Sequence, residues 1–192
     1  MRYSRTHKQQ TRARLLQAAS RLFKTRGYHG VGVDAIMNAE GLTAGGFYAH
    51  FNSKETLLCE TFDLAFAQTT ARILAGLSDC EGIEWLGEVV RRYLSRPHRD
   101  DVGEGCPLPA LSAEVARSNA RVRRRFQTFL EELVAEFEHK LSGSVGAPKD
   151  RAIAALALCV GGVILSRAVK DAELSDQILQ ACRRDAVRET LG

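Results

Sequence analysis

The sequence lacks the cysteine and histidine spacings of a metal site. It has five cysteines, and no two of them form a C-x-x-C pair or join a Cys/His cluster. The five are Cys59, Cys80, Cys106, Cys159 and Cys182. This scatter excludes a structural zinc site and a disulfide scaffold, and an odd count in a cytoplasmic chain predicts mostly reduced thiols. No Ser/His/Asp or Cys/His set has catalytic spacing either, so we expect no metal, no cofactor and no enzymatic activity.

Long hydrophobic runs are also absent. The longest apolar stretch, 152–166, is closed by Arg167 and is shorter than the roughly 20 residues that span a bilayer. It is typical of a buried core or dimer helix. The first ten residues contain no apolar run, which does not favour a secretory signal. We therefore expect a soluble cytoplasmic protein that does not contact a membrane.

Acidic residues are scarce in the first quarter of the chain. Residues 1–56 contain nine lysines and arginines against three acids, a net charge of about +6, whereas the whole chain carries +4. The other 136 residues therefore total about −2. This asymmetry predicts a polyanionic partner for the N-terminal part, although a basic helix can also be merely solvated.

Alternating strand patterns are missing, and helical periodicity runs almost throughout. We predict helices over 6–26, 33–39, 43–50, 53–77, 82–96, 107–117, 121–141, 151–170 and 174–190, with a Gly/Pro-broken loop at 97–106. The expected fold is all-α with about nine helices. We place a three-helix DNA-binding domain at 1–52 and a larger helical domain for ligand sensing and dimerisation at 53–192.

Two short helices joined by a glycine-containing turn follow the basic first helix. Residues 33–39 form the first, Glu40-Gly41-Leu42 the turn, and Thr43 caps the second. This is the arrangement of a helix-turn-helix, whose second helix enters the major groove of DNA. Small residues at its start permit close approach to base edges.

The segment 27–58 resembles the DNA-binding signature of the TetR/AcrR repressor family. Its core from Gly45 to Leu58 reads G-x-F-Y-x-H-F-x-S-K-E-x-L-L, and the close resemblance covers about residues 8–60. The resemblance implies that Thr43, Ala44, Gly45 and Gly46 face bases or the adjacent backbone. It also implies that Tyr48, His50 and Lys54 contact phosphates, and that Phe47 and Phe51 belong to the core. We add the N-terminal arm with Arg2, Arg5 and Lys8 to the DNA contacts, although an arm of this kind can also be only solubilising.

The chain departs from the family pattern at three positions. Ala44 stands where lysine is common, Gly46 where serine or threonine is common, and Gly32 where a helix cap is common. Side-chain contacts to bases are therefore expected to be few, with more specificity from backbone approach and DNA shape. Two adjacent glycines cost roughly 1 kcal/mol each relative to alanine in a helix, which favours a packing reason for them.

The sensor half gives weaker signals. Six aromatic residues are candidates for an apolar ligand pocket or, alternatively, simple core: Phe62, Phe66, Trp85, Tyr93, Phe126 and Phe129. Cys106 precedes the Pro107 helix, and we expect it to be accessible with a lowered thiol pKa and to sense electrophiles, unless it only fits the turn. The basic run 121–125 is interpreted as a solvated helix face in this half.

The last two helices are predicted to pair with those of a second copy, as the resemblance implies. The interface candidates are Ala157, Gly161, Ile164 and Leu165, although the two helices could instead only complete the monomer core. The expected function is a homodimeric repressor that leaves a palindromic operator when a small molecule binds or a thiol is modified. The alternative is an inducer-independent activator or architectural DNA-binding protein of the same fold.

Overall fold

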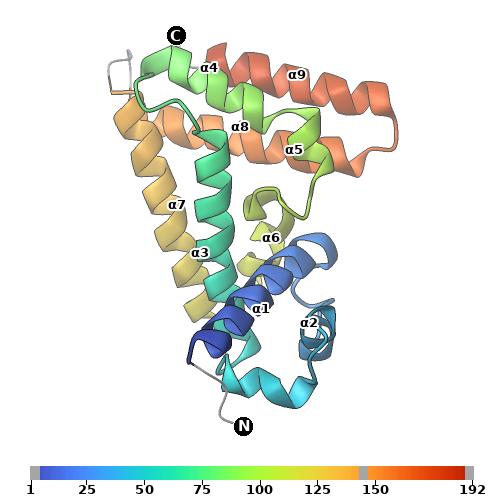
Figure 1. Ribbon diagram of the computed structural model, residues 1–192. Coiled ribbons are helices and arrows are strands. Elements are labelled where there is room, and N and C mark those ends of the chain that lie inside the picture. The colour runs from blue at the N-terminus through green and yellow to red at the C-terminus, as the bar shows by residue number, and fades with distance from the viewer. Residues whose placement is uncertain (1–4, 143–146, 189–192) are drawn as a thin grey trace. The chain divides into compact units, whose positions relative to one another are not determined.

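The computed structural model describes residues 5–142 and 147–188, with side chains from residue 6 onward. All regular structure in these ranges is helical, which confirms the all-α prediction (Figure 1). The described residues form ten helical elements rather than about nine. They are α1 (Arg5–Arg26), α2 (Val33–Ala39), the 3-10 helix η1 (Ala44–Ala49), α3 (Lys54–Ile73), α4 (Gly82–Tyr93), α5 (Arg96–Asp100), α6 (Pro107–Ala116), α7 (Ala120–Lys140), α8 (Pro148–Ala168) and α9 (Ala172–Arg188).

The chain divides into two compact units. Unit 1 comprises Met1–Gln68 and Val102–Phe126, and unit 2 comprises Thr69–Asp101 and Gln127–Gly192. Unit 1 thus contains α6 and the beginnings of α3 and α7 in addition to the segment predicted to bind DNA. The domain boundary after residue 52 stays a prediction about function, because the packing groups the chain differently.

Unit 1 is built on the apolar stripe of α1. Leu15, Ala19 and Phe23 recur every four residues, and all three are fully buried. The helix ends where Gly27, at a φ of +77°, donates its N–H to the Phe23 carbonyl at 2.9 Å. A left-handed glycine after the last helical residue is the usual helix stop. This stop sets where α2 begins and therefore positions the DNA-binding segment.

Unit 2 centres on the pair α8 and α9, which lie side by side (Figure 1). A Cβ atom on Gly162 would lie 2.8 Å from Leu94 Cδ2 and 3.0 Å from Cys182 Sγ. Ala152 and Ala155 are also buried on this inner side of α8. These small residues therefore permit close packing within the unit.

Helix α8 is longer than the apolar stretch indicated. With 21 residues it is long and apolar enough, by length and composition alone, to cross a membrane, contrary to the prediction from sequence. One helix of this kind is weak evidence, because core helices of soluble proteins pass the same test. One side of α8 packs against α9 and α4.

The loop predicted at 97–106 is partly wrong. Residues Arg96–Asp100 form α5, because Ser95 Oγ accepts the His98 N–H at 3.3 Å and Pro97 occupies the first helical turn. Proline is compatible with that turn, where the amide hydrogens have no helical partner. Helix α3 also ends at Ile73, before the predicted end at Leu77.

His98 should make the fold acid-sensitive. Its ring is 5% exposed and its Nδ1 lies 2.6 Å from the Tyr93 carbonyl, and burial lowers its pKa to about 4 from an ordinary 6.5. The unfolded chain takes up this proton first, so stability is lost as pH falls from 6.5 towards 4, by about 2 kcal/mol at pH 5. Urea unfolding at pH 7 and pH 5 measures the loss. A His98→Gln variant should lose clearly less stability over this interval, and an equal loss would contradict the assignment.

Candidate DNA interface

Helix α2, the turn after it and η1 form the predicted helix-turn-helix. Helix α2 has the predicted bounds, and the turn closes with Leu42 N–H donating to the Met37 carbonyl at 3.0 Å. Gly41 has a φ of +68°, which favours glycine, and a side chain there would be strained. The buried side chains of Ile36 and Phe47 anchor α2 and η1 in the core of unit 1. The sequence motif thus folds into the geometry that it predicted.

The second helix of the motif differs from the expectation in its type. Residues Ala44–Ala49 form a 3-10 helix, and Thr43 stands at its N-cap without a side-chain cap bond. Gly45 is exposed with nothing within 4 Å of an added Cβ, whereas a Cβ on Gly46 would lie 3.3 Å from Met37 Cε. The packing reason expected for the glycines therefore holds for Gly46. Gly45 instead leaves the surface of the helix open.

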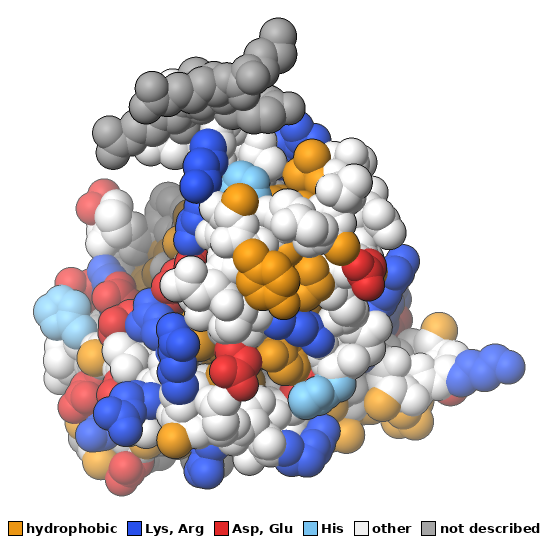
Figure 2. Space-filling model, turned by 90° about the horizontal axis from the view of Figure 1, so that it is seen from below, with side chains coloured by type: hydrophobic (Ala, Val, Ile, Leu, Met, Phe, Trp, Pro, Cys, Tyr) orange, Lys and Arg blue, Asp and Glu red, His pale blue; other side chains and the backbone are white. Residues whose placement is uncertain are grey.

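Tyr48 points its side chain into solvent. It is 72% exposed, while its ring edge still contacts buried Phe47 at 5.3 Å between centroids. Figure 2 views the molecule from below and shows lysine and arginine side chains around a face with exposed hydrophobic side chains at its middle. An exposed phenol hydroxyl is suited to a phosphate oxygen.

We expect Tyr48→Phe to weaken DNA binding without lowering stability. The substitution removes only an exposed hydroxyl, and one lost hydrogen bond to a charged phosphate is worth about 1.5–3 kcal/mol, or roughly tenfold or more in affinity. Fluorescence anisotropy with labelled DNA measures the affinity, and thermal unfolding serves as the control. Equal affinity of both proteins would remove Tyr48 from the phosphate contacts.

Basic residues of α1 border the motif. Arg12 donates its Nε to the His50 carbonyl at 3.3 Å, pairs with Glu60, and lies 4.6 Å from the centre of the Phe51 ring. These contacts tie α1 to the end of η1. Lys8 is exposed on α1 one turn earlier. Arg5 begins the helix, but its side chain and Arg2 lie outside the described part of the chain.

Lys54 is held within unit 1 rather than extended. Its Nζ donates to the Tyr28 carbonyl at 2.6 Å and lies 4.1 Å from the centre of the Tyr28 ring. Burial lowers the pKa of this ammonium group, and the nearby Glu114 carboxylate opposes that shift. An ammonium group has three donors, so one bond to Tyr28 leaves others for a phosphate. The phosphate contact of Lys54 stays a prediction, with a geometry that the sequence did not indicate.

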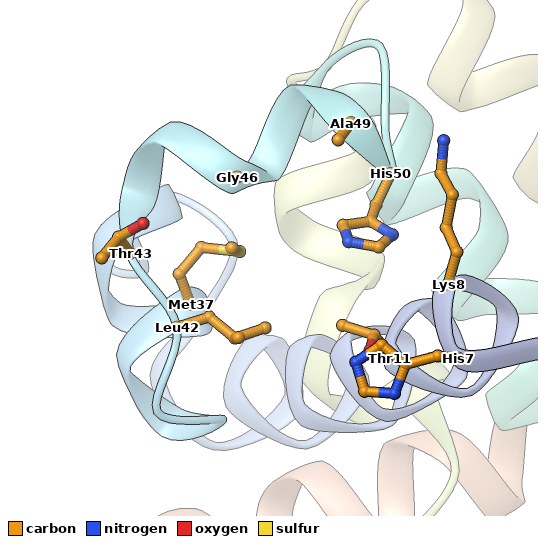
Figure 3. A pocket seen from close by; sticks show the side chains of 9 residues that line it. All are labelled: His7, Lys8, Thr11, Met37, Leu42, Thr43, Gly46, Ala49 and His50. Atoms are coloured by element: carbon orange, nitrogen blue, oxygen red, sulfur yellow. The ribbon is translucent and has the colours of Figure 1, made fainter. Parts of the chain in front are cut away.

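A cleft of about 480 Å³ lies between α1 and the helix-turn-helix. Figure 3 shows Met37 and Leu42 on one side and His7, Thr11 and His50 on the other. His50 Nδ1 is buried there without a hydrogen-bond partner. Burial, and next the charges of Lys8 and Arg12, lower the His50 pKa. The lowered pKa favours the neutral form of the His50 ring.

The aromatic candidates for a ligand pocket belong to separate clusters. Phe62, Phe66 and Phe126 pack together in unit 1, with centroid distances of 5.7 to 6.5 Å. In unit 2, Trp85 packs on Phe137 at 4.8 Å and Tyr93 on His98 at 4.4 Å. Phe129 is half-buried on α7 in unit 2. Their contacts are those of core residues, and a pocket-lining role stays a prediction.

Cys106 occupies the predicted position but not the predicted environment. It is the N-cap of α6, as expected from the two prolines that follow, yet it is only 4% exposed. The expectation of an accessible thiol is therefore wrong. Its burial follows from the packing of α6 on α1, where Lys24 Nζ donates to the Gly105 carbonyl at 3.2 Å. Its role as a sensor stays a prediction.

The predicted dimer residues lie on an uncovered face of α8. Ile164 and Leu165 are 40% and 56% exposed, Ala157 is exposed, and an added Cβ on Gly161 would meet nothing within 4 Å. They do not complete the core of the monomer. The basic run 121–125, by contrast, lies entirely in unit 1, and Arg125 pairs there with Asp63.

Comparison with known proteins identifies the helix-turn-helix unit. Residues 15–61 match the family described as "Bacterial regulatory proteins, tetR family". The transcriptional regulator LmrA of Bacillus subtilis is 28% identical over 170 residues, which cover 84% of this chain and 88% of LmrA.

Solved structures extend the likeness over nearly the whole chain. A TetR transcriptional regulator from Chloroflexus aurantiacus is 28% identical, with a TM-score of 0.79 and 95% of each chain covered. A regulator from Saccharomonospora viridis, solved in complex with choline, shares the fold at 22% identity and a TM-score of 0.75, over 94% of this chain and 96% of that one. With the helix-turn-helix in place and the family matched across it, residues 15–61 form a DNA-binding unit of the TetR family, and the chain as a whole is similar to TetR transcriptional regulators.

Proposed function

We propose that this regulator is a homodimeric repressor that occupies a palindromic DNA operator and leaves it when an effector acts on the protein. The observation that carries the proposal is the pair of open surfaces on the molecule. Helix η1, the second helix of the helix-turn-helix and the proposed recognition helix, presents Gly45 and Tyr48 to solvent. Helix α8 presents an apolar face. The first surface fits a DNA groove and the second fits another copy of the chain.

The exposed face of α8 supports the dimer. Ile153, Ala157, Gly161, Ile164 and Leu165 follow a helical spacing of three, four or seven residues, so they share one side of the helix. Large apolar side chains seldom stay exposed together on a soluble monomer. The glycine and alanine on this face permit two helices to approach closely. A two-fold dimer then presents two recognition helices to half-sites about one turn of DNA apart.

A small molecule is the better supported effector. The same-fold regulator from Saccharomonospora viridis was solved with choline, whereas the thiol of Cys106 in this chain is buried. Selective thiol modification requires access as well as a lowered thiol pKa. A thiol response would therefore need a local opening of α6 before the reagent reaches the sulfur. Such a regulator would act in the cytoplasm, where the DNA is.

A gel shift on the DNA upstream of the chain's own gene tests repression and release together. Binding followed by release with a compound that also raises the melting temperature supports a small-molecule effector. Release by a mild electrophile, lost in Cys106→Ser, would instead support the thiol. If no compound or electrophile releases the DNA, the proposal of an effector-released repressor is contradicted. The result would then support the alternative of an inducer-independent activator or architectural DNA-binding protein.

A further inference from the structure

The turn between α1 and α2 is held by a carboxylate from a helix far along the chain. Glu114 of α6 accepts the Tyr28 N–H at 2.8 Å on Oε2 and the His29 N–H at 3.1 Å on Oε1. Both oxygens of one side chain are thus used on two consecutive backbone amides. Charge-assisted bonds of this kind are stronger than those between neutral groups and fix the geometry of the backbone.

Gly27 leaves the room that this arrangement needs. A Cβ on Gly27 would lie 3.1 and 3.2 Å from the two Glu114 oxygens, and its φ of +77° also favours glycine. The residue therefore ends α1 and at the same time admits the carboxylate. The close approach is built into the backbone of the turn.

The turn that Glu114 holds also positions Lys54. The Tyr28 carbonyl accepts the Lys54 ammonium at 2.6 Å, and the Tyr28 ring lies 4.1 Å below the same nitrogen. Tyr28 is thus fixed by Glu114 on its N–H side and holds Lys54 on its carbonyl side. The Glu114 charge also acts on Lys54 directly and raises its pKa against the effect of burial.

From these contacts we propose that Glu114 is a positioning residue for DNA binding, which acts by holding the Tyr28 turn and through it the Lys54 ammonium. The proposal rests on the proposed phosphate contact of Lys54. It assigns to α6, the helix that begins at Cys106, a direct bond to the DNA-binding segment. A change that moves α6 would therefore loosen the placement of Lys54.

The sign of the effect separates this role from general electrostatics. Removing a carboxylate from a DNA-binding unit makes it more positive, which by itself strengthens attraction to DNA. Glu114→Ala should nevertheless weaken binding about tenfold, the loss expected for one charge-assisted phosphate contact. It should also reduce the slope of affinity against salt by about one ion, which is the effect that we expect of Lys54→Ala. Glu114→Gln keeps one acceptor oxygen, so its affinity for DNA should lie between that of Glu114→Ala and that of the unchanged protein.

Asp63→Ala is the matched control. It removes a carboxylate from the same unit, and Asp63 pairs with Arg125 rather than with the turn. Its affinity should equal or exceed that of the unchanged protein. All variants are compared by anisotropy on one DNA duplex across a salt series, with thermal unfolding to confirm that each is folded.

A double-substitution cycle then tests whether Glu114 acts through Lys54. In a Lys54→Ala background, Glu114→Ala should have little further effect, because the group that it positions is gone. Independent, additive losses would overturn the proposal, as would unchanged or tighter binding by Glu114→Ala alone. If Lys54→Ala itself binds like the unchanged protein, the phosphate role of Lys54 fails and the proposal with it. If Glu114→Ala loses DNA binding while Lys54→Ala keeps it, Glu114 does not act by positioning Lys54.

Discussion

Replacing Gly161 with glutamate is expected to convert the protein from a dimer into a folded monomer. An added Cβ on Gly161 meets nothing within 4 Å inside the chain, so we expect the substitution to leave unit 2 intact. In the proposed dimer the same carboxylate would be buried without a partner, which costs several kcal/mol. A cost of that size raises the dissociation constant of the dimer by roughly a thousandfold. Operator binding should be lost with the dimer.

Sedimentation velocity at tens of micromolar measures the change, and circular dichroism confirms the helical content. Two controls separate the interface from the fold. Gly87→Glu adds the same charge on α4, where an added Cβ also meets nothing within 4 Å, and should stay dimeric. Gly162→Ala should instead lower stability, because its Cβ would collide with Leu94. A dimeric Gly161→Glu protein, or an unsubstituted protein that is monomeric, would contradict the proposed interface.

Replacing Gly45 with glutamate is expected to abolish DNA binding while the protein stays folded and dimeric. Gly45 is exposed on η1 with open space around it, and glutamate is a better helix former than glycine by several tenths of a kcal/mol. The domain should therefore not be destabilised. A carboxylate on a surface that approaches phosphates and base edges is repelled, and the added bulk prevents close approach. We expect affinity to fall by at least about a hundredfold, or about 2.7 kcal/mol.

Anisotropy titration with specific and with random-sequence DNA measures this loss. Gly87→Glu again serves as the charge control and should bind DNA like the unchanged protein. Gly45→Ala adds only a methyl group and should lose much less affinity than Gly45→Glu. Retained binding by Gly45→Glu would mean that η1 does not face the DNA.

Local signals in the sequence were sufficient for the helix-turn-helix. Helix α2 begins and ends where the pattern predicts, and α6 begins at Pro107 as expected. The reason is physical, because a short helix is bounded by its caps, and glycine and proline act on their own neighbourhood. The missed helix α5 carried such a signal too. Ser95 and Pro97 are its cap and a first-turn residue, whereas the predicted helix 82–96 runs through Ser95 and the predicted loop begins at Pro97.

Contacts between distant residues could not be predicted in the same way. Glu114 lies 86 residues from Tyr28, and nothing in the spacing of α6 indicates an amide partner. The bond from Lys54 to the Tyr28 carbonyl is similarly invisible, because a backbone carbonyl has no residue signature. The burial of Cys106 depends on how α6 packs on α1, whereas its N-cap position follows from the local prolines.

The central claim is that a dimer of this chain reads a two-fold operator through η1, and selection from random DNA tests it most directly. The purified protein is incubated with a library of random double-stranded DNA, and retained molecules are amplified and sequenced over several rounds. The account predicts an enriched palindrome with half-sites about one helical turn apart, which Gly45→Glu does not enrich. Retention without any enriched sequence, or enrichment of a single half-site without symmetry, would contradict it.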